Sequence, residues 1–171
     1  MILRALTLAA GVTGAAGASQ FPEFSQQYVQ RLGGAVDELS RFVEEFDADA
    51  AQVGLSRDAA LKDLAEGGAM GAQRAETMGR TLARYDRLSA DLTALSAAGP
   101  FTRAYYAGRM GDNEIAERAW ATFRPAMPLT FEGVTFAGFG FFTGWIAAAG
   151  LLSLVRRLFR RGQGGRAAST A

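Results

Sequence analysis

The sequence contains no cysteine and no histidine. The lack of cysteine excludes disulfide bonds, thiolate chemistry and lipoprotein acylation, and the lack of both removes the usual ligands of zinc, haem and iron–sulfur centres. No P-loop or dinucleotide-binding pattern is present, and the glycine run at residues 67–71 lies in a helical pattern without a preceding strand. We therefore expect no enzymatic activity, no catalytic residue, no cofactor and no metal site.

Acidic residues are absent from both ends of the chain. All 17 lie between Glu23 and Glu132, whereas the charged residues of the two ends are arginines. Basic ends around an acidic middle are typical of a membrane protein whose ends face the cytoplasm and whose middle is exported. Because a nucleic-acid-binding protein would concentrate basic charge in its folded part, we expect no nucleic acid partner.

A long stretch without a charged residue runs from Gly133 to Val155. About 20 apolar residues span a bilayer as a helix, so residues 132–157 are predicted to form a transmembrane helix. An arginine cluster that marks the cytoplasmic side follows it, here called the orientation arginines: Arg156, Arg157, Arg160 and Arg161. Residues 158–171 are expected to form a basic cytoplasmic tail.

The N-terminal apolar run, residues 1–20, allows two interpretations. Arg4, the apolar residues after it and the small residues at 16–18 are typical of a cleavable signal peptide. The same run is long enough for an uncleaved transmembrane anchor built mainly from alanine and glycine. The residues of the run favour neither interpretation over the other.

Both apolar segments carry small residues at a spacing of four, here called the packing residues: Ala10, Gly14, Ala18, Gly140, Gly144 and Ala148. This spacing allows two membrane helices to approach closely. One interpretation is a helix–helix contact, with an aromatic face on the other side of the second segment, made of Phe136, Phe139, Phe142 and Trp145. The other is that glycine and phenylalanine are simply tolerated in membrane helices.

Apolar residues recur at steps of three and four through region 21–98, which predicts helices at about residues 22–53 and 57–97. A short link, with Gly54 ending the first helix and Ser56 capping the second, would make them antiparallel neighbours. The main residues of the predicted seam, here called the seam residues, are Leu32, Val36, Leu39, Val43, Phe46, Leu61, Leu64, Met78, Leu82 and Tyr85. The small residues from Gly68 to Ala75 either admit another backbone or make the second helix bendable.

Residues 99–131 are expected to lead to the membrane and to include a short third helix, capped by Asp112 and running through Ala119. The aromatic residues of region 99–131 either pack against the base of the hairpin or form an interfacial belt at the outer membrane surface. They are Phe101, Tyr105, Tyr106 and Trp120. The predicted fold is thus an all-α membrane protein, in which two transmembrane helices flank a long antiparallel helical hairpin, coiled-coil-like, plus a short third helix.

Two groups of charged residues in the predicted hairpin are candidates for binding sites. Arg80, Arg84 and Arg87 form a basic stripe that would meet lipid phosphates, or face solvent with Asp86 and Asp91 as partners. The acidic group at the end of the first helix, made of Glu44, Glu45, Asp47 and Asp49, lacks the glycine and the ligand spacing of a calcium loop. We interpret it as a solvated surface.

Two membrane-proximal motifs carry a resemblance to a known family. They are Ser19–Gly33, SQFPEFSQQYVQRLG, and Phe123–Gly133, FRPAMPLTFEG, with the turn at Gly54–Ser56 between them. With these motifs the chain resembles the DUF2937 family of proteobacterial membrane proteins over nearly its whole length, except the basic tail. The resemblance implies that the N-terminal run is retained, and it supplies no activity and no functional residues.

We therefore expect a non-enzymatic accessory or scaffold subunit of the bacterial inner membrane, which associates with itself or joins other membrane protein subunits in a larger complex. Its partners would include the lipid bilayer, the bulk of the chain would be periplasmic, and both termini would be cytoplasmic. The alternative is a singly anchored envelope protein whose periplasmic hairpin binds a soluble partner or the cell-envelope polymer. Loss of residues 1–18 from the purified protein would favour this alternative.

Overall fold

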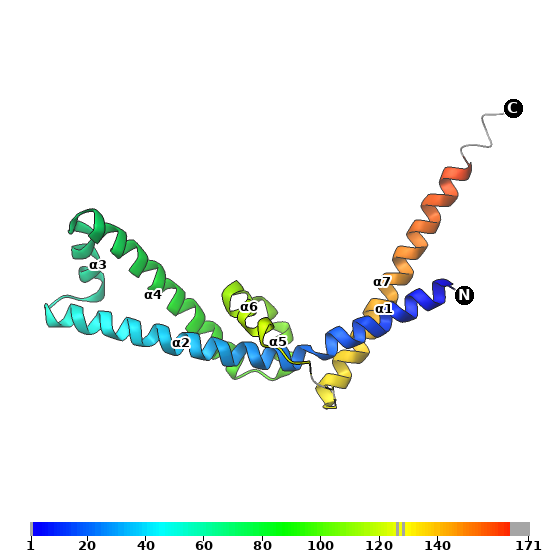
Figure 1. The fold of residues 1–171 in the computed structure, drawn as a ribbon, viewed down its shortest axis with the longest axis horizontal. Coiled ribbons are helices and arrows are strands. Elements are labelled where there is room, and N and C mark those ends of the chain that lie inside the picture. The colour runs from blue at the N-terminus through cyan, green and yellow to red at the C-terminus, as the bar shows by residue number, and fades with distance from the viewer. Residues whose placement is uncertain (1, 126, 128, 165–171) are drawn as a thin grey trace. The chain divides into compact units, whose positions relative to one another are not determined.

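A computed structural model of the protein describes residues 2–125, 127 and 129–164, with side chains as far as Arg157. Every regular element within these ranges is a helix (Figure 1). The chain forms two compact units: unit 1 comprises Met1–Glu23 and Arg124–Ala171, and unit 2 comprises Phe24–Phe123. The all-α fold predicted from the sequence is therefore confirmed for the described residues.

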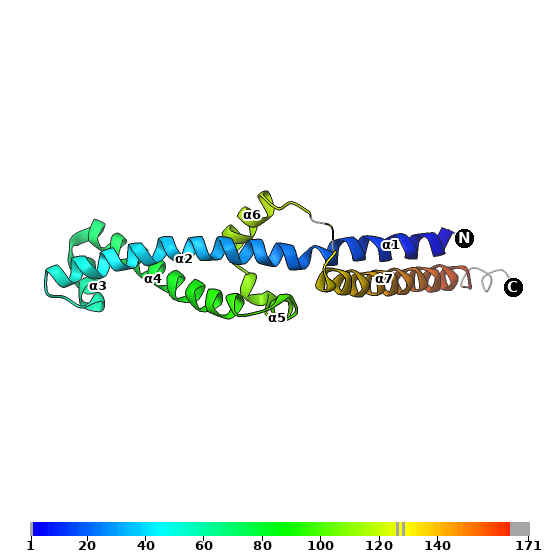
Figure 2. The same ribbon diagram turned by 90° about the horizontal axis from the view of Figure 1, so that it is seen from below.

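Unit 1 contains two apolar helices, α1 (Ile2–Ser19) and α7 (Phe131–Gly164), which lie side by side (Figures 1 and 2). Two helical stretches of the described chain are long and apolar enough to cross a membrane, Ile2–Gln52 and Phe131–Arg157. The sequence places the end of the second span at residue 157, but α7 continues as a helix to Gly164. Residues 165–171 of the expected tail lie outside the described residues.

Unit 2 contains most of α2 (Phe21–Gln52) and all of α4 (Gly68–Ser96). Apolar residues spaced three or four apart share one face of a helix, and these faces meet in two clusters. The first cluster buries Tyr28, Leu32, Val36, Leu88, Leu95, Ile115 and Ala119. The second buries Val43, Met78 and Leu82. The core of this unit is therefore a narrow line of side chains rather than a broad interior.

The link between α2 and α3 (Arg57–Glu66) is short and well capped. Gly54 has a φ of +74°, in the left-handed region that glycine enters at low cost, and it follows the end of α2. The hydroxyl of Ser56 accepts a hydrogen bond from the backbone N–H of Ala59 at 3.3 Å, as expected for the cap of α3. These two residues reverse the chain where the sequence predicts a turn.

The single helix expected at residues 57–97 is interrupted, and α3 and α4 stand in its place. The interruption lies at Gly67 and Gly68, and Gly68 has a φ of +84°. Each glycine costs about 1 kcal/mol in a helix relative to alanine, and no side chain from residue 55 to residue 77 is buried to offset that cost. A Cβ on Gly71 would collide with the carbonyl oxygen of Leu64, so the start of α4 lies directly against α3.

Three short helices complete unit 2: α5 (Pro100–Tyr105), the 3-10 helix η1 (Ala107–Met110) and α6 (Asn113–Ala121). The carboxylate of Asp112 caps α6 as predicted, because it accepts a hydrogen bond from the backbone N–H of Ile115 at 3.3 Å. Region 99–131 is expected to be a connector, but it is divided between the units. Its helices pack on the first cluster as far as Phe123, and Arg124 begins the return to unit 1.

Candidate functional site: the contact between α1 and α7

The contact between α1 and α7 is built from small residues. Gly14 and Gly140 meet backbone to backbone, and neither has room for a Cβ atom. A Cβ on Gly144 would lie 2.5 Å from the carbonyl oxygen of Ala10, and a Cβ on Gly140 would lie 2.6 Å from the Cβ of Ala18. Any larger residue at these two positions of α7 would therefore force the helices apart.

The structure brings all the packing residues together except Ala148, which is half-buried farther along α7. It also adds two residues that the spacing of four does not reveal. Gly11 is buried, and a Cβ there would lie 2.8 Å from the Cε2 atom of Phe141. Gly11 precedes Gly14 by three residues, so a search at both helical spacings would find it. An aromatic ring that fills the space over a glycine leaves no such signal in the sequence.

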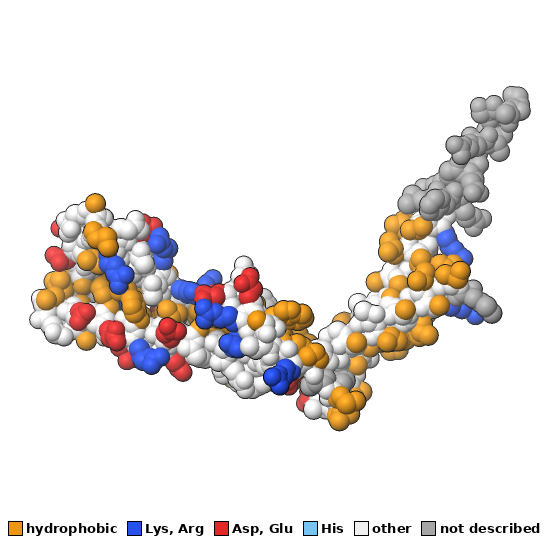
Figure 3. All heavy atoms as spheres, viewed as in Figure 1, with side chains coloured by type: hydrophobic (Ala, Val, Ile, Leu, Met, Phe, Trp, Pro, Cys, Tyr) orange, Lys and Arg blue, Asp and Glu red, His pale blue; other side chains and the backbone are white. Residues whose placement is uncertain are grey.

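Apart from Phe141, several large apolar side chains of this helix pair are exposed away from the contact. On α7, Phe139 is 72% exposed and Phe142 is 60% exposed, and Trp145 is exposed beside them. Leu8 and Val12 are likewise more than half exposed on α1, and Figure 3 shows hydrophobic side chains along both helices. Most of the aromatic face predicted for α7 is therefore exposed on the surface of the helix pair.

Phe136 is the exception on the aromatic face. Its ring lies 5.3 Å from the ring of Phe21, and the side chain is half-buried rather than exposed. Phe136 precedes Gly140 by four residues, so it lies on the same face of α7 as the glycines, one turn nearer the start of the helix. The sequence prediction for this residue therefore needs correction: it extends the contacts of α7 beyond α1 to Phe21, the first residue of α2.

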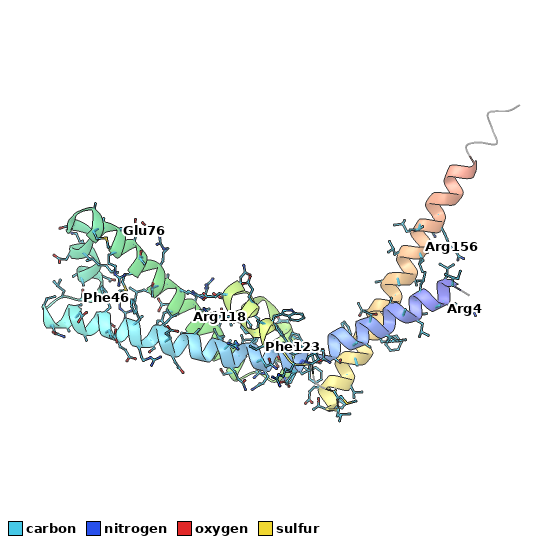
Figure 4. The ribbon with its side chains drawn as sticks, viewed as in Figure 1. Arg4, Phe46, Glu76, Arg118, Phe123 and Arg156 are labelled. Carbon is cyan, nitrogen blue, oxygen red and sulfur yellow. The ribbon has the colours of Figure 1, made fainter. Side chains whose placement is uncertain are left out.

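Arginines lie at one end of the helix pair. Arg4 of α1 and Arg156 of α7 are near each other at that end, and both are exposed (Figure 4). Arg157 is exposed as well, and Arg160 and Arg161 follow on the same helix, although their side chains lie outside the described residues. The orientation arginines thus continue a helix rather than starting a separate tail.

The seam residues occupy the two clusters of unit 2. Leu32 and Val36 are buried in the first cluster, with Leu39 and Tyr85 partly buried against it. Val43, Met78 and Leu82 form the second cluster, with Phe46 and Leu61 partly buried against it. Leu64 is half-buried near the interruption of the helix. The sequence pattern missed Tyr28, whose side chain is fully buried and whose hydroxyl accepts a hydrogen bond from the backbone N–H of Asp112 at 3.3 Å.

Asp112 also joins α6 to α4 through charge. Its carboxylate accepts hydrogen bonds from Arg84 and Arg87, each at 3.2 Å, and only 10% of its side chain is exposed. Arg84 donates a second bond to Glu114 at 2.7 Å, which raises the pKa of the Arg84 guanidinium. Two of the three arginines of the basic stripe, Arg84 and Arg87, are therefore engaged with α6, whereas Arg80 pairs with Glu76 of its own helix.

The ion-pair partners of the basic stripe differ from those expected. Arg84 and Arg87 pair with Asp112 rather than with Asp86 or Asp91. Asp91 instead binds Arg109 at 2.9 Å. The sequence pattern considers only partners on the same helix, whereas the partners of Arg84, Arg87 and Asp91 come from the region of the short helices that follows α4.

Arg103 of α5 is buried, at 8% exposure, and has neutral partners. Its Nε donates to the carbonyl oxygen of Leu95 at 3.0 Å, and its Nη1 donates to the side-chain oxygen of Gln26 at 2.6 Å. The Leu95 carbonyl lies at the C-terminal end of α4, where carbonyls lack helical partners and a cation is stabilised by the helix dipole. Arg103 therefore ties α5 and α4 to α2.

The four aromatic residues of region 99–131 do not share one role. Tyr106 packs against the first cluster, which agrees with packing at the base of unit 2. Tyr105 is 85% exposed and Trp120 is 69% exposed, so burial does not explain either of them. Phe101 is also exposed, at 46%.

The described side chains include no group of three acidic residues, placed closely enough to hold a metal ion. A protein-family model described as "Protein of unknown function (DUF2937)" matches residues 2–161 of the chain. No curated protein and no solved structure matches the chain. Because the match begins at the start of α1 and ends within α7, it includes both helices of the contact. The chain belongs to the DUF2937 family.

Proposed function

We propose that the protein is a non-enzymatic accessory or scaffold subunit of the bacterial inner membrane. In this proposal α1 and α7 are two antiparallel membrane-spanning legs, and unit 2 is an exported helical hairpin. The protein associates with itself or joins a larger complex of membrane proteins. The lipid bilayer surrounds the outer faces of the two legs.

The inverted packing of α1 and α7 carries the proposal. In water, a pair of helices gains most by burying its largest apolar side chains against each other. Here the glycines face inward, whereas Phe139 and Phe142 face outward. Lipid tails solvate large apolar side chains, so helices in a membrane associate through small residues that permit close backbone contact. The arrangement of this pair fits a bilayer and not an aqueous surface.

The order of the contacts supports the antiparallel arrangement. Ala10 meets Gly144, and Ala18, two turns later on α1, meets Gly140, one turn earlier on α7. In unit 2, Leu32 shares a cluster with Leu88 and Leu95, while Val43, farther along α2, shares one with Met78 and Leu82 of α4. Both pairs of helices thus progress in opposite directions along the chain.

The orientation rests on the arginines. Arg4 and Arg156 lie at one end of the helix pair, and basic residues are retained on the cytoplasmic side of bacterial membrane proteins. Both termini would then be cytoplasmic. Unit 2 would be periplasmic, in agreement with the acidic residues that lie only between Glu23 and Glu132.

The alternative is a protein with a single anchor, in which α1 is a cleaved signal peptide and the hairpin binds a soluble partner or the envelope polymer. The same contact argues against it. Without α1, the glycine face of α7 at Gly140 and Gly144 would have no matching backbone, although its shape fits α1 closely. Retention of α1 also agrees with a family match that begins at residue 2.

The test is purification of the full chain from membranes in a mild detergent, followed by native and intact mass spectrometry. We expect an intact mass that includes residues 1–18, and a native complex larger than one chain, made of several copies or of this protein with companion subunits. A mass that lacks residues 1–18 would overturn the two-legged arrangement. A retained N-terminus in a clean monomer would overturn the accessory-subunit role alone.

A further inference from the structure

Trp120 is the large aromatic side chain of α6 that faces away from the core of unit 2. It is 69% exposed, whereas the residue before it, Ala119, is completely buried. An exposed tryptophan leaves a large apolar area in contact with water, which is costly unless another surface covers the ring. The exposure of Trp120 therefore needs an explanation from its surroundings.

Loose attachment of α6 does not account for the exposure. At the start of α6, the backbone N–H of Asp112 donates to the hydroxyl of Tyr28 at 3.3 Å. At its end, Arg31 donates to the hydroxyl of Thr122 at 2.8 Å. Ile115 is buried between these two attachments, at 3% exposure. The helix is thus fixed to α2 at both ends, and its orientation about its own axis directs the Trp120 ring outward.

The ring of Trp120 is itself held in place. It stacks on Phe123, with ring centroids 5.8 Å apart and planes 13° apart, and its edge meets Phe24 at 5.9 Å. Phe24 and Phe123 also contact each other, edge to face, at 5.9 Å. In these three residues, here called the aromatic platform, each ring contacts the other two.

Chain connectivity limits how far Phe24, one member of the platform, can lie from the end of α1. Phe24 is in the first turn of α2, which starts at Phe21, and Phe21 is two residues after Ser19, where α1 ends. An extended residue spans at most about 3.6 Å and a helical residue rises about 1.5 Å, so Phe24 lies within roughly 12 Å of the end of α1. The headgroup region of a bilayer is about 5–8 Å thick on each side of the hydrocarbon core. Phe24 can therefore lie at the depth of the headgroups, and so can the Trp120 ring that contacts it.

The chain that returns to the membrane has the same character. Met127 is 81% exposed, Leu129 is 84% exposed and Phe131 is 77% exposed, and all three follow the platform on the way to the long span of α7. Three exposed large apolar residues, two in the connector and one at the start of α7, suit the boundary between headgroups and acyl chains far better than water. The connector and the platform thus favour the same environment.

We propose that Trp120 inserts into the headgroup layer of the outer leaflet and anchors unit 2 to the membrane surface. Tryptophan concentrates at this depth because its ring is apolar while its indole N–H needs a hydrogen-bond partner. The anchor rests on the proposed membrane placement of α1 and α7. It gives unit 2 a non-covalent attachment to the membrane besides its two covalent links to unit 1. The occupant of the platform is thus lipid, not a protein.

The chain contains two tryptophans, Trp120 and Trp145, so each can be observed alone. The full chain with Trp145→Phe reports Trp120, and the full chain with Trp120→Phe reports Trp145 of the α7 span. Both are placed in phosphatidylcholine vesicles that carry bromine either high on the acyl chain, next to the headgroup, or near its end. Bromine quenches tryptophan fluorescence at contact, and circular dichroism verifies that both variants keep the helical content of the parent.

We expect Trp120 to be quenched about twofold or more by the high bromine and clearly less by the deep bromine, because interfacial tryptophan stays at the headgroup level. Trp145 should respond to the deep bromine. If Trp145 is quenched but Trp120 responds to neither lipid, the anchor is wrong and the membrane placement stands. Stronger quenching of Trp120 by the deep bromine would also overturn the anchor. If neither tryptophan is quenched, the membrane placement itself is wrong.

Discussion

Gly144 lies so close to Ala10 that a Cβ atom on it would be 2.5 Å from the Ala10 carbonyl oxygen. The two helices are therefore in backbone contact, one turn from the second such contact between Gly14 and Gly140. Van der Waals packing is one of the few forces that hold helices together in lipid, and it falls steeply when a gap opens. The stability of unit 1 thus depends on the absence of side chains at a few positions.

Substitution of Gly144 by leucine should separate α1 from α7. The added side chain would force a backbone shift, with a loss of about 1–3 kcal/mol as found for overpacked contacts. Gly138→Leu is the matched control, because it lies on the same helix with nothing within 4 Å of a Cβ. Thermal unfolding of the full chain in detergent should show a lower midpoint for Gly144→Leu alone. Equal midpoints for the two variants would remove the basis for the contact.

Because α3 and α4 are separate helices, replacing two glycines of α4 by alanine should change the stability of unit 2 in opposite directions. Gly71→Ala places a methyl group against the Leu64 carbonyl oxygen and should destabilise unit 2. Gly79→Ala has nothing within 4 Å and should stabilise it by up to about 1 kcal/mol, the helix-propensity gain of alanine over glycine. Chemical denaturation of the full chain, followed by circular dichroism, measures both. A stabilising Gly71→Ala would mean that α3 and α4 join into one continuous helix.

Arg103→Met should be among the most destabilising single changes in unit 2. The methionine fills similar space, but it removes the donor of the Gln26 side chain and one of the donors of the Leu95 carbonyl, at a cost of about 2 kcal/mol. Arg118→Met is the comparison, since Arg118 is exposed and pairs with Glu114 on its own helix, where such pairs contribute about 0.3–0.5 kcal/mol. The two variants are compared by the same denaturation. Similar losses would show that Arg103 is not a structural tie.

Tyr28 should make stability fall at alkaline pH. Burial raises the pKa of its hydroxyl above the ordinary value of about 10, because the charged form loses its hydration. Its contribution is fully present below that ordinary value and is lost as the pH rises through the raised folded-state pKa. Tyr28→Phe should cost about 1 kcal/mol at neutral pH, through the unpaired N–H of Asp112, and should lose less stability than the parent above pH of about 10. Parallel alkaline profiles would contradict this role.

The periodic and compositional features of the sequence predict much of this architecture. Leu32, Val36, Val43, Met78 and Leu82 repeat at helical spacing, and all of them are buried. Ser56 and Asp112 cap helices because a cap depends on the side chain and on residues at most three positions away. Such local rules act within a few residues, so they can be applied to a sequence without knowledge of the fold.

The remaining features depend on contacts between distant residues. Arg103 is buried only because Leu95 and Gln26 meet it there, and no local pattern marks an arginine as buried. Arg84 pairs with Asp112 rather than with a neighbour on α4, since α6 folds back over that helix. The low helix propensity of Gly67 and Gly68 can be recognised in the sequence. Whether it breaks the helix depends on how much side-chain burial nearby offsets the cost of the glycines, which the sequence does not reveal.

A direct measurement of the central claim is a disulfide between Gly11→Cys and Phe141→Cys in native membranes, which is unambiguous because the chain has no other cysteine. The ring of Phe141 fills the space over Gly11, so two cysteines in place of these residues share that space, whereas Gly138→Cys faces open space and replaces Phe141→Cys in the control pair. After mild oxidation and trypsin digestion, we predict that the fragments carrying positions 11 and 141 remain joined until they are reduced, and that the control pair does not form. Unjoined fragments, or a chain from which position 11 has been removed, would contradict the account of a membrane protein held together by α1 and α7.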